Sequence, residues 1–271
     1  QVFFRVYYFF VKPSLFLVRS NIRALRNEKF VFSGHLYAQQ SLFLDNTAFF
    51  LNKRSFISSA DSWNEKSKEK LWLYNLHYLD DLNSINSFNR VFWHEELILR
   101  WIDENRAGEG NGWESYTLSL RLVNIVKWLH RNNIHNQKIL NSLLEQAKYL
   151  IHRLEYHIAA NHLLANAKAL IFIGLFLDEN QGRHFFDKGL EIFKVQIREQ
   201  FLDDGGHFEL SPMYHGIVLW DVLELIDLVG KVNKYDLKSE VEIWKDVAQK
   251  AIKWLSYMSH PDGKISFFND A

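Results

Sequence analysis

The chain has no cysteine, which excludes disulfides, thiolate catalysis and cysteine-based metal sites. It has only three prolines in 271 residues, so long helices can run without interruption. Basic and acidic side chains balance to a formal net charge of zero. The composition therefore gives no reason to expect a nucleic-acid partner or an anionic membrane, although a neutral total is compatible with a local basic cleft.

Long apolar runs are missing too. The opening residues are strongly apolar, but Arg5, Lys12 and Pro13 interrupt them well short of the roughly 20 apolar residues that a membrane span requires. We therefore expect no membrane span, and no signal-peptide cleavage pattern is visible. Because the chain begins without Met and stops abruptly after Ala271, we expect a fragment that lacks something at its C-terminus.

What the sequence does contain is helical periodicity. Residues 1–60 have a mixed pattern, and we expect a small irregular, partly helical segment there that packs on the rest. From about residue 64 onward the apolar spacing is helical, and residues 163–177 are apolar nearly all round, which is typical of a helix buried among others. Roughly eight helices at hairpin-like spacing, without β-α-β alternation, predict an all-α fold. We assign residues 61–271 to an incomplete (α/α) toroid of helical hairpins.

Two later helices have clear boundary signals. Ser211 is a good N-cap, Pro212 suits the first helical position and Gly230 is placed to follow the last turn. A further helix is expected over residues 238–259, before the turn signal at residues 260–263.

The helix expected over residues 117–130 has an apolar stripe and, opposite it, a polar face. One interpretation is a solvated face preceded by a glycine-bearing loop. The other is a groove in which a guanidinium and an amide bind carboxylate or sulfate while aromatic rings stack on sugars. The side chains concerned are Trp113, Tyr116, Arg121, Asn124 and Trp128.

The pair Asn161–His162 stands where another helix should begin. Asn161 is a plausible N-cap for that helix, and His162 shares a face with Asn166 four residues later. Polar groups that enter an apolar helix need partners, so they either bond each other in the core or point into a cleft.

Tyr214 would be the third residue of the helix that starts after Ser211, with His215 beside it. The positive end of a helix dipole favours an anionic ligand and the phenolate form of a nearby tyrosine, which could then act as acid and base. His207 and Glu209 add titratable groups in the preceding loop. The spacing of the histidines is not one that we expect to bind a metal, and no cofactor motif is present.

Several of these runs together resemble the heparinase II/III family of polysaccharide lyases, in its N-terminal helical part. The resemblance spans roughly residues 72–271. It rests on residues 73–78, Gly112-Trp113-Glu114-Ser115-Tyr116 continuing to Asn124, residues 155–157 leading to Asn161-His162-Leu163-Leu164-Ala165-Asn166, residues 205–210 continuing into Ser211-Pro212-Met213-Tyr214-His215, and residues 260–270.

The resemblance implies an incomplete toroid followed by a large antiparallel β domain, which is missing here. It implies β-elimination of an acidic, uronic-acid polysaccharide or oligosaccharide, such as heparan sulfate or alginate. Asn161 would neutralise the uronate carboxylate with help from His162, and Tyr214 would be the catalytic acid, or acid and base. Without the β domain we expect little or no activity. Candidate substrate-binding residues are Trp113, Tyr116, Arg121, Asn124, His207, Glu209, His215 and Asn269.

Two other functions stay open. The same cleft could serve a noncatalytic carbohydrate-binding protein in bacterial surface-polysaccharide production, since the helical half is most similar to family members associated with that process. A glycoside hydrolase would need two carboxylic acids, for which Glu209 and Asp270 are the candidates. The resemblance suggests the periplasm or cell envelope, with the cytoplasm as the alternative.

Overall fold

The structure is a computed structural model, and it describes residues 8, 23–34, 36, 38–232 and 235–269. The apolar opening and Asp270 lie outside this range. The α-helices of the described part are α2 (Lys70–Tyr78), α3 (Val91–Glu104), α4 (Ser115–Arg131), α5 (Gln137–Ile151), α6 (Ala160–Phe176), α7 (Glu179–Gln200), α8 (Pro212–Val232) and α9 (Lys238–Tyr257). None of these helices is both long enough and apolar enough to cross a membrane.

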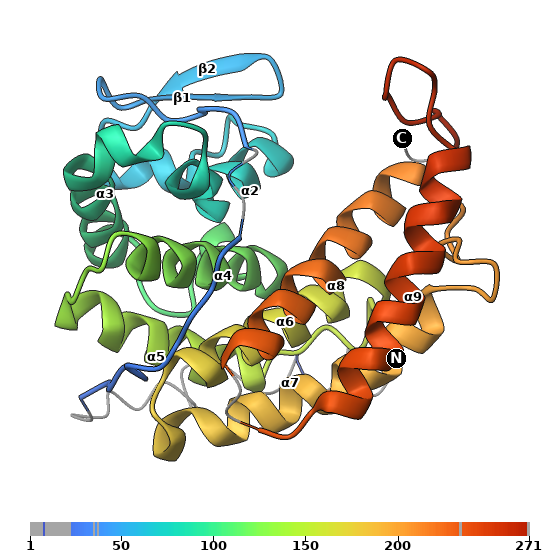
Figure 1. The fold of residues 1–271 in the computed structure, drawn as a ribbon. Helices are drawn as coiled ribbons and strands as arrows, with labels where there is room; N and C mark the ends of the chain where they lie inside the picture. The colour runs from blue at the N-terminus through green and yellow to red at the C-terminus, as the bar shows by residue number, and fades with distance from the viewer. Residues whose placement is uncertain (1–7, 9–22, 35, 37, 233–234, 270–271) are drawn as a thin grey trace.

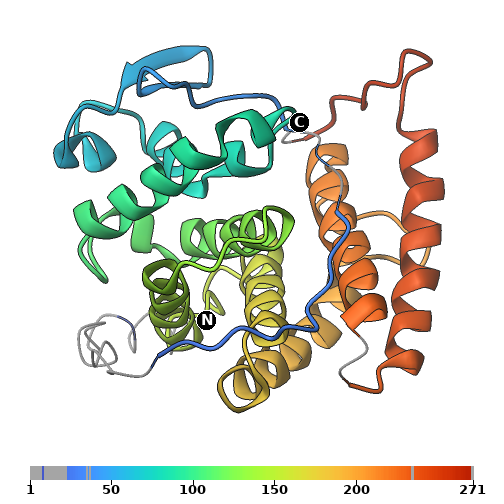
Figure 2. The same cartoon turned by 60° about the vertical axis from the view of Figure 1, so that its left-hand side comes forward.

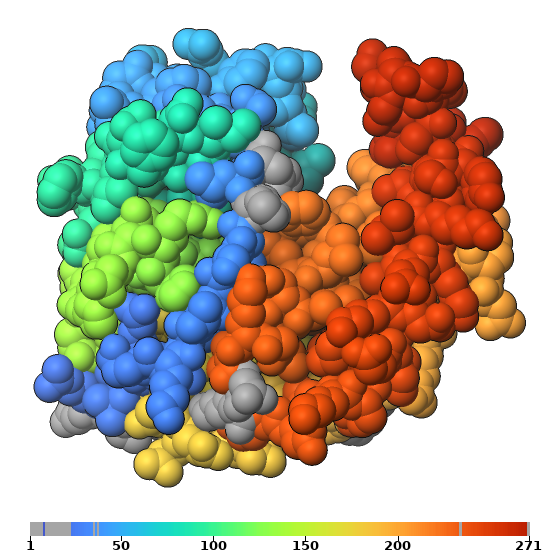
Figure 3. Space-filling view, in the orientation of Figure 1, coloured from blue at the N-terminus to red at the C-terminus, as the bar shows by residue number. Residues whose placement is uncertain are grey.

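The helices pack as antiparallel neighbours that curve around an opening (Figures 1 and 2). Helices α2 to α5 form one side, α6 and α7 form the base, and α8 and α9 stand as an arm on the other side. The space-filling view shows the hollow between the N-terminal part and this arm (Figure 3). Hairpins of helices on an open arc are what the sequence predicted.

The N-terminal segment is less irregular than expected, because it contains an antiparallel hairpin of β1 (Thr47–Phe50) and β2 (Lys53–Phe56). Its attachment to the helices depends on the buried carboxylate of Asp81. The backbone N–H groups of Ser41 and Leu42 donate to Asp81 at 2.8 and 3.2 Å, and Arg90 and His94 donate to it at 2.9 and 3.0 Å. Burial alone would raise the pKa of Asp81, but these donors outweigh it and lower that pKa.

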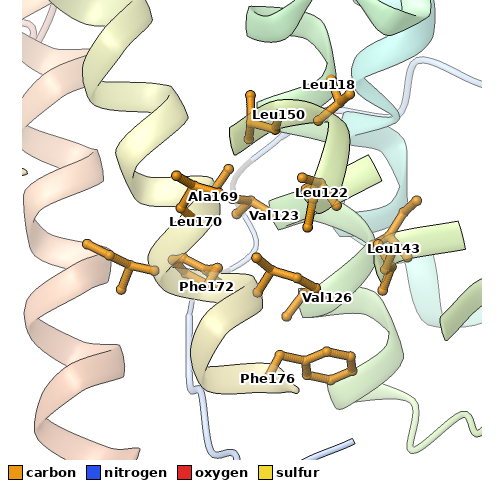
Figure 4. Packing of buried hydrophobic residues seen from close by; sticks show 14 of the residues in the cluster. Leu118, Leu122, Val123, Val126, Leu143, Leu150, Ala169, Leu170, Phe172 and Phe176 are labelled. Carbon is orange, nitrogen blue, oxygen red and sulfur yellow. The ribbon is translucent and has the colours of Figure 1, made fainter. Parts of the chain in front are cut away.

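Helix α6 is the centre of the fold. Every residue from Leu163 to Phe176 is buried, which confirms the prediction from its all-round apolar sequence. The apolar stripe of α4 faces it, and Figure 4 shows the side chains of both helices interlocking around Val126 and Phe172. Helices α6 and α7 approach so closely that glycines are needed at their contact, Gly182 of α7 lying against the backbone of Gly174.

The boundary signals were right at the start of α8 and wrong at its end. Ser211 Oγ accepts from the backbone N–H of Tyr214 at 3.2 Å, and Pro212 is the first helical residue. Gly230, however, lies inside α8, which continues to Val232. A glycine costs a helix only about 1 kcal/mol, and burial of Val229 and Val232 is worth more than that. Helix α9 matches the expected range within two residues.

The contact between α6 and α7 gives a stability prediction. A Cβ on Gly182 would lie 2.2 Å from the carbonyl oxygen of Gly174. Gly182→Ala must therefore push the two helices apart, and we expect a loss of about 1–3 kcal/mol in the free energy of unfolding, measured in urea. Gly230→Ala is the control, because a Cβ there meets nothing within 4 Å among the described residues. It should be neutral or should stabilise α8 by about 0.5–1 kcal/mol, and equal effects of the two substitutions would contradict the packing argument.

Candidate active-site cleft

The hollow between the two sides contains a cleft of about 460 Å³. Helices α4, α6 and α8 supply most of its walls, with Asp80 and Ile265 at its edges. Of the residues predicted from the sequence, Tyr116, Asn124 and Asn161 line it. Sequence reasoning missed Trp220, whose partly exposed ring also lines the cleft and offers a face for a sugar.

One of the candidate catalytic residues, His162, contacts Tyr116. The imidazole of His162 stacks on the Tyr116 ring, with 4.3 Å between ring centroids and 31° between planes. Burial, and then the carboxylates of Asp221 and Asp80, raise the pKa of Tyr116, so it is a neutral phenol. Neither Tyr214 nor His162 is among the described residues that line the cleft, although their neighbours Met213 and Asn161 are. Tyr214 is half-buried in the first turn of α8, between Met213 and Gly216.

Asn161 is not the N-cap that we predicted. Helix α6 already begins at Ala160, and its cap position, Ala159, forms no side-chain cap hydrogen bond. Both alanines have positive φ, 64° at Ala159 and 49° at Ala160, a conformation that costs an L-residue of order 1–3 kcal/mol. This tight entry moves Asn161 into the first turn of the helix, where it lines the cleft.

The two polar residues that follow take different places. Asn166 is fully buried, and its amide donates to Ser119 Oγ and Glu155 Oε2 at 3.0 Å each. The His162 side chain is 29% exposed, and its Nδ1 lies 3.0 Å from Glu155 Oε1. We expected His162 and Asn166 either to bond each other in the core or to point into a cleft. Instead, both side chains bind a third residue, Glu155. In the sequence, the only indication that Glu155 belongs to the site was its position at the start of residues 155–157, one of the runs that resemble the family.

A buried network of four charged side chains forms the floor of the cleft, and the sequence did not reveal it. Lys127 of α4 pairs with Glu224 of α8, and Lys168 of α6 pairs with both Glu224 and Asp221 of α8, the latter at 2.5 Å. Burial would raise the pKa of Glu224, but the lysines hold it at about 2. Burial, reinforced by Lys168, lowers the pKa of Lys127 to about 8.

Arg121 does not lie in the groove that we expected. It is fully buried, its guanidinium 3.8 Å from the centre of the Trp101 ring, and it donates to Gln146 Oε1 at 3.0 Å and to the carbonyl of His77 at 3.3 Å. Trp128 is buried as well. The polar face of α4 is thus an inner face, because neighbouring helices cover α4 on both sides. Asn124 reaches the cleft, but its amide donates to Asp80 at 2.7 Å and to the carbonyl of Tyr78 at 3.0 Å.

Three other candidate substrate-binding side chains are buried. Trp113 packs on the rings of Trp101 and Tyr149. His215 stacks on Trp254, with 4.6 Å between ring centroids, and its Nε2 bonds the carbonyl of Ala251. His207 is buried with its Nε2 3.3 Å from Gln200 Oε1.

The remaining candidates lie on an outer loop. Asn269 donates to the carbonyls of Glu209 and Leu210 at 3.2 and 2.9 Å, so it fastens the C-terminal segment to the loop before α8. Among the described residues, no group of three or more His, Asp or Glu side chains is arranged to hold a metal ion.

The ion network gives a stability prediction. Lys168→Met removes the ion pair of buried Asp221 and leaves Glu224 paired with Lys127 alone. Breaking a buried pair in this way costs about 3–5 kcal/mol, which urea unfolding would measure. The matched control is Lys194→Met, which removes a half-exposed partner of Glu240 and should cost about 0–1 kcal/mol. Similar losses for the two variants would show that the network does not hold the helices.

His207 gives a prediction on pH dependence. Burial, with His215 nearby, lowers the pKa of His207 from 6.5 to about 4. Between these values the unfolded chain binds a proton that the folded chain does not, so stability must fall as the pH drops through this window. We expect His207→Gln to flatten the pH dependence of the unfolding free energy by up to about 1.4 kcal/mol per pH unit. The exposed His260→Gln is the control, and parallel curves for His207→Gln and wild type would contradict the assignment.

Comparison with known proteins identifies the family of the chain. A family model described as the heparinase II/III N-terminus matches residues 104–271. A heparin-sulfate lyase from Bacteroides stercoris is 31% identical over 134 residues, covering 48% of this chain and 19% of the relative. One from Bacteroides thetaiotaomicron is 25% identical over 208 residues, covering 67% and 29%. The chain thus spans less than a third of the length of these lyases.

A solved structure of heparinase III superposes with a TM-score of 0.62 at 18% identity, over 92% of this chain and 43% of that one. At this identity the likeness concerns the fold alone, and it confirms the predicted incomplete toroid. Since the family model covers more than half of the sequence, the chain belongs to the heparinase II/III family, in its N-terminal helical part.

Proposed function

We propose that the chain is the toroid part of a polysaccharide lyase that cleaves a uronic-acid-containing polysaccharide by β-elimination. The observation that carries the proposal is the stacking of His162 on Tyr116 beside a cleft that Tyr116 and Asn161 both line, with Pro212 and Met213 from the start of α8, next to Tyr214, lining it too. Family membership and the heparin-sulfate lyases among the relatives support the same reaction class.

The chemistry requires stabilisation of a dianion. Removing the proton α to a uronate carboxylate places a second negative charge next to the first. Hydrogen-bond donors fixed in advance near that carboxylate lower the barrier by several kcal/mol in comparable enzymes. The Asn161 amide and the positive end of α6 supply such donors, and His162 adjoins them as the next residue. The α proton passes to a base, either the Tyr214 phenolate or a group of the proposed C-terminal β domain. As the carbon–oxygen bond breaks, the phenol of Tyr214 gives a proton to the departing glycosidic oxygen.

The charge of the cleft bears on the substrate. Its two lysines, Lys127 and Lys168, already pair with Glu224 and Asp221, and Asp80 adds a further carboxylate at the edge. Among the described lining residues no cation is left over for a sulfate. A substrate panel should therefore include unsulfated polyuronates beside heparan sulfate.

The chain spans only part of its relatives, so we propose that further groups come from a C-terminal β domain and that the chain alone is inactive or weak. For the location we propose the periplasm or cell envelope, on the family resemblance alone. Fractionation of the source cell would test this.

The central prediction concerns Tyr214. In the full-length protein that contains this chain, ultraviolet absorbance of the unsaturated product should rise with one member of the panel. Tyr214→Phe should lower the rate at least about 100-fold while changing affinity less than about threefold, because it removes a proton donor needed only in the transition state. The exposed Tyr257→Phe is the matched control and should be fully active.

Other outcomes would favour other functions. Binding without any product, across the panel, would favour the noncatalytic carbohydrate-binding protein. Activity that survives Tyr214→Phe and is lost in Glu209→Gln would favour a glycoside hydrolase. Its second carboxylic acid, Asp270, lies outside the described residues.

A further inference from the structure

Glu155 occupies an unusual position for a carboxylate. It lies in the connection between α5 and α6, its side chain is buried, and its carbonyl accepts from the backbone N–H of Ala159 at 2.8 Å. Its two carboxylate oxygens face different residues of α6, Oε1 facing His162 and Oε2 facing Asn166. It therefore connects the strained entry of α6 with the histidine that stacks on Tyr116, a residue of the cleft lining.

The backbone N–H of Glu155 determines which groups donate and which accept in the hydrogen bonds around this residue. The backbone N–H of Glu155 can only donate, and it donates to Asn166 Oδ1 at 2.8 Å. The NH₂ group of Asn166 must then be the donor to Glu155 Oε2 and to Ser119 Oγ. Ser119 is free to accept, because its own hydroxyl donates to the carbonyl of Ser115 at 2.8 Å.

The tautomer of His162 follows in turn. A carboxylate accepts hydrogen bonds, and Glu155 already accepts one from Asn166, so we assign the proton of the His162–Glu155 hydrogen bond to Nδ1 of His162. Nε2 is then the nitrogen that is left for a ligand. The stacking of the ring on Tyr116 restricts its rotation, so tautomer and orientation are both set before a substrate arrives.

We propose that Glu155 is the positioning residue of this site, and that it makes His162 capture a proton when a uronate binds. This inference rests on the proposed function. A uronate carboxylate can only accept hydrogen bonds, whereas Nε2 of the neutral Nδ1–H ring has a lone pair. Nε2 must therefore take one proton from solvent to donate to the substrate. The resulting imidazolium lies between two carboxylates and makes charge-assisted bonds to both.

Glu155→Gln tests this without removing a hydrogen-bond partner. The oxygen of the new amide would accept from Asn166, so its NH₂ would face Nδ1 of His162 and donate to it. The ring proton must then move to Nε2. Nitrogen chemical shifts of the His162 ring in the ligand-free chain should show Nδ1–H in the wild type and Nε2–H in Glu155→Gln. The exposed Glu191→Gln, which also loses one carboxylate, should keep the wild-type tautomer.

The second arm measures proton uptake. Calorimetry of uronate oligosaccharides in buffers of different ionisation heat, in a Tyr214→Phe background that does not consume them, should give an uptake of about one proton per ligand at neutral pH. With Glu155→Gln the proton uptake should fall to about zero, because Nε2 of His162 already carries its proton. The affinity for the oligosaccharide should fall about tenfold, because a neutral ring then donates in place of a charged one.

The outcomes are separable. If no uronate oligosaccharide binds, the proposed function fails, while the ring nitrogens still decide the role of Glu155. An Nε2–H tautomer in the wild type, or no change in Glu155→Gln, would overturn the positioning role. So would an uptake that is the same in both proteins. A purely structural Glu155 would change thermal stability without moving the ring proton.

Discussion

Four charges buried between three helices are the constraint on which the site depends. Lys127, Lys168, Asp221 and Glu224 join α4, α6 and α8, the helices that carry Tyr116, Asn161 with His162, and Tyr214. Desolvation makes such a network costly unless every member is paired. The network therefore ties together the three helices that supply most of the walls of the cleft.

The same logic separates polar groups that hold the fold from polar groups left for a ligand. Arg121, Asn124 and Asp81 are engaged by several partners each, and so they position backbone rather than substrate. Asn161, in contrast, lines the cleft from the first turn of α6, at the positive end of the helix dipole. The positive φ angles of Ala159 and Ala160 are a local cost of bringing Asn161 and His162 there, as is common at functional sites.

Features of the fold that depend on neighbouring residues could be predicted from the sequence, whereas features that depend on contacts between distant residues could not. The burial of α6, the stripe on α4 and the Ser211–Pro212 start of α8 are local signals, and all three were confirmed. The burial of Arg121 was not predictable, because periodicity shows that a face is polar but not whether another helix covers it. Asn161 had the right residue type for a cap, but the tight turn at Ala159 depends on contacts with Glu155 that sequence spacing does not show.

The burial of α6 has a further consequence during synthesis. Residues 163–177 emerge from the ribosome before α7 and α8, which later cover them, and this apolar run contains a single charged side chain, Lys168. A charge within such a run opposes aggregation and keeps it from resembling a membrane segment. Lys168 therefore protects the nascent chain while it is solvated, and it stabilises the finished fold once Asp221 and Glu224 arrive to neutralise it.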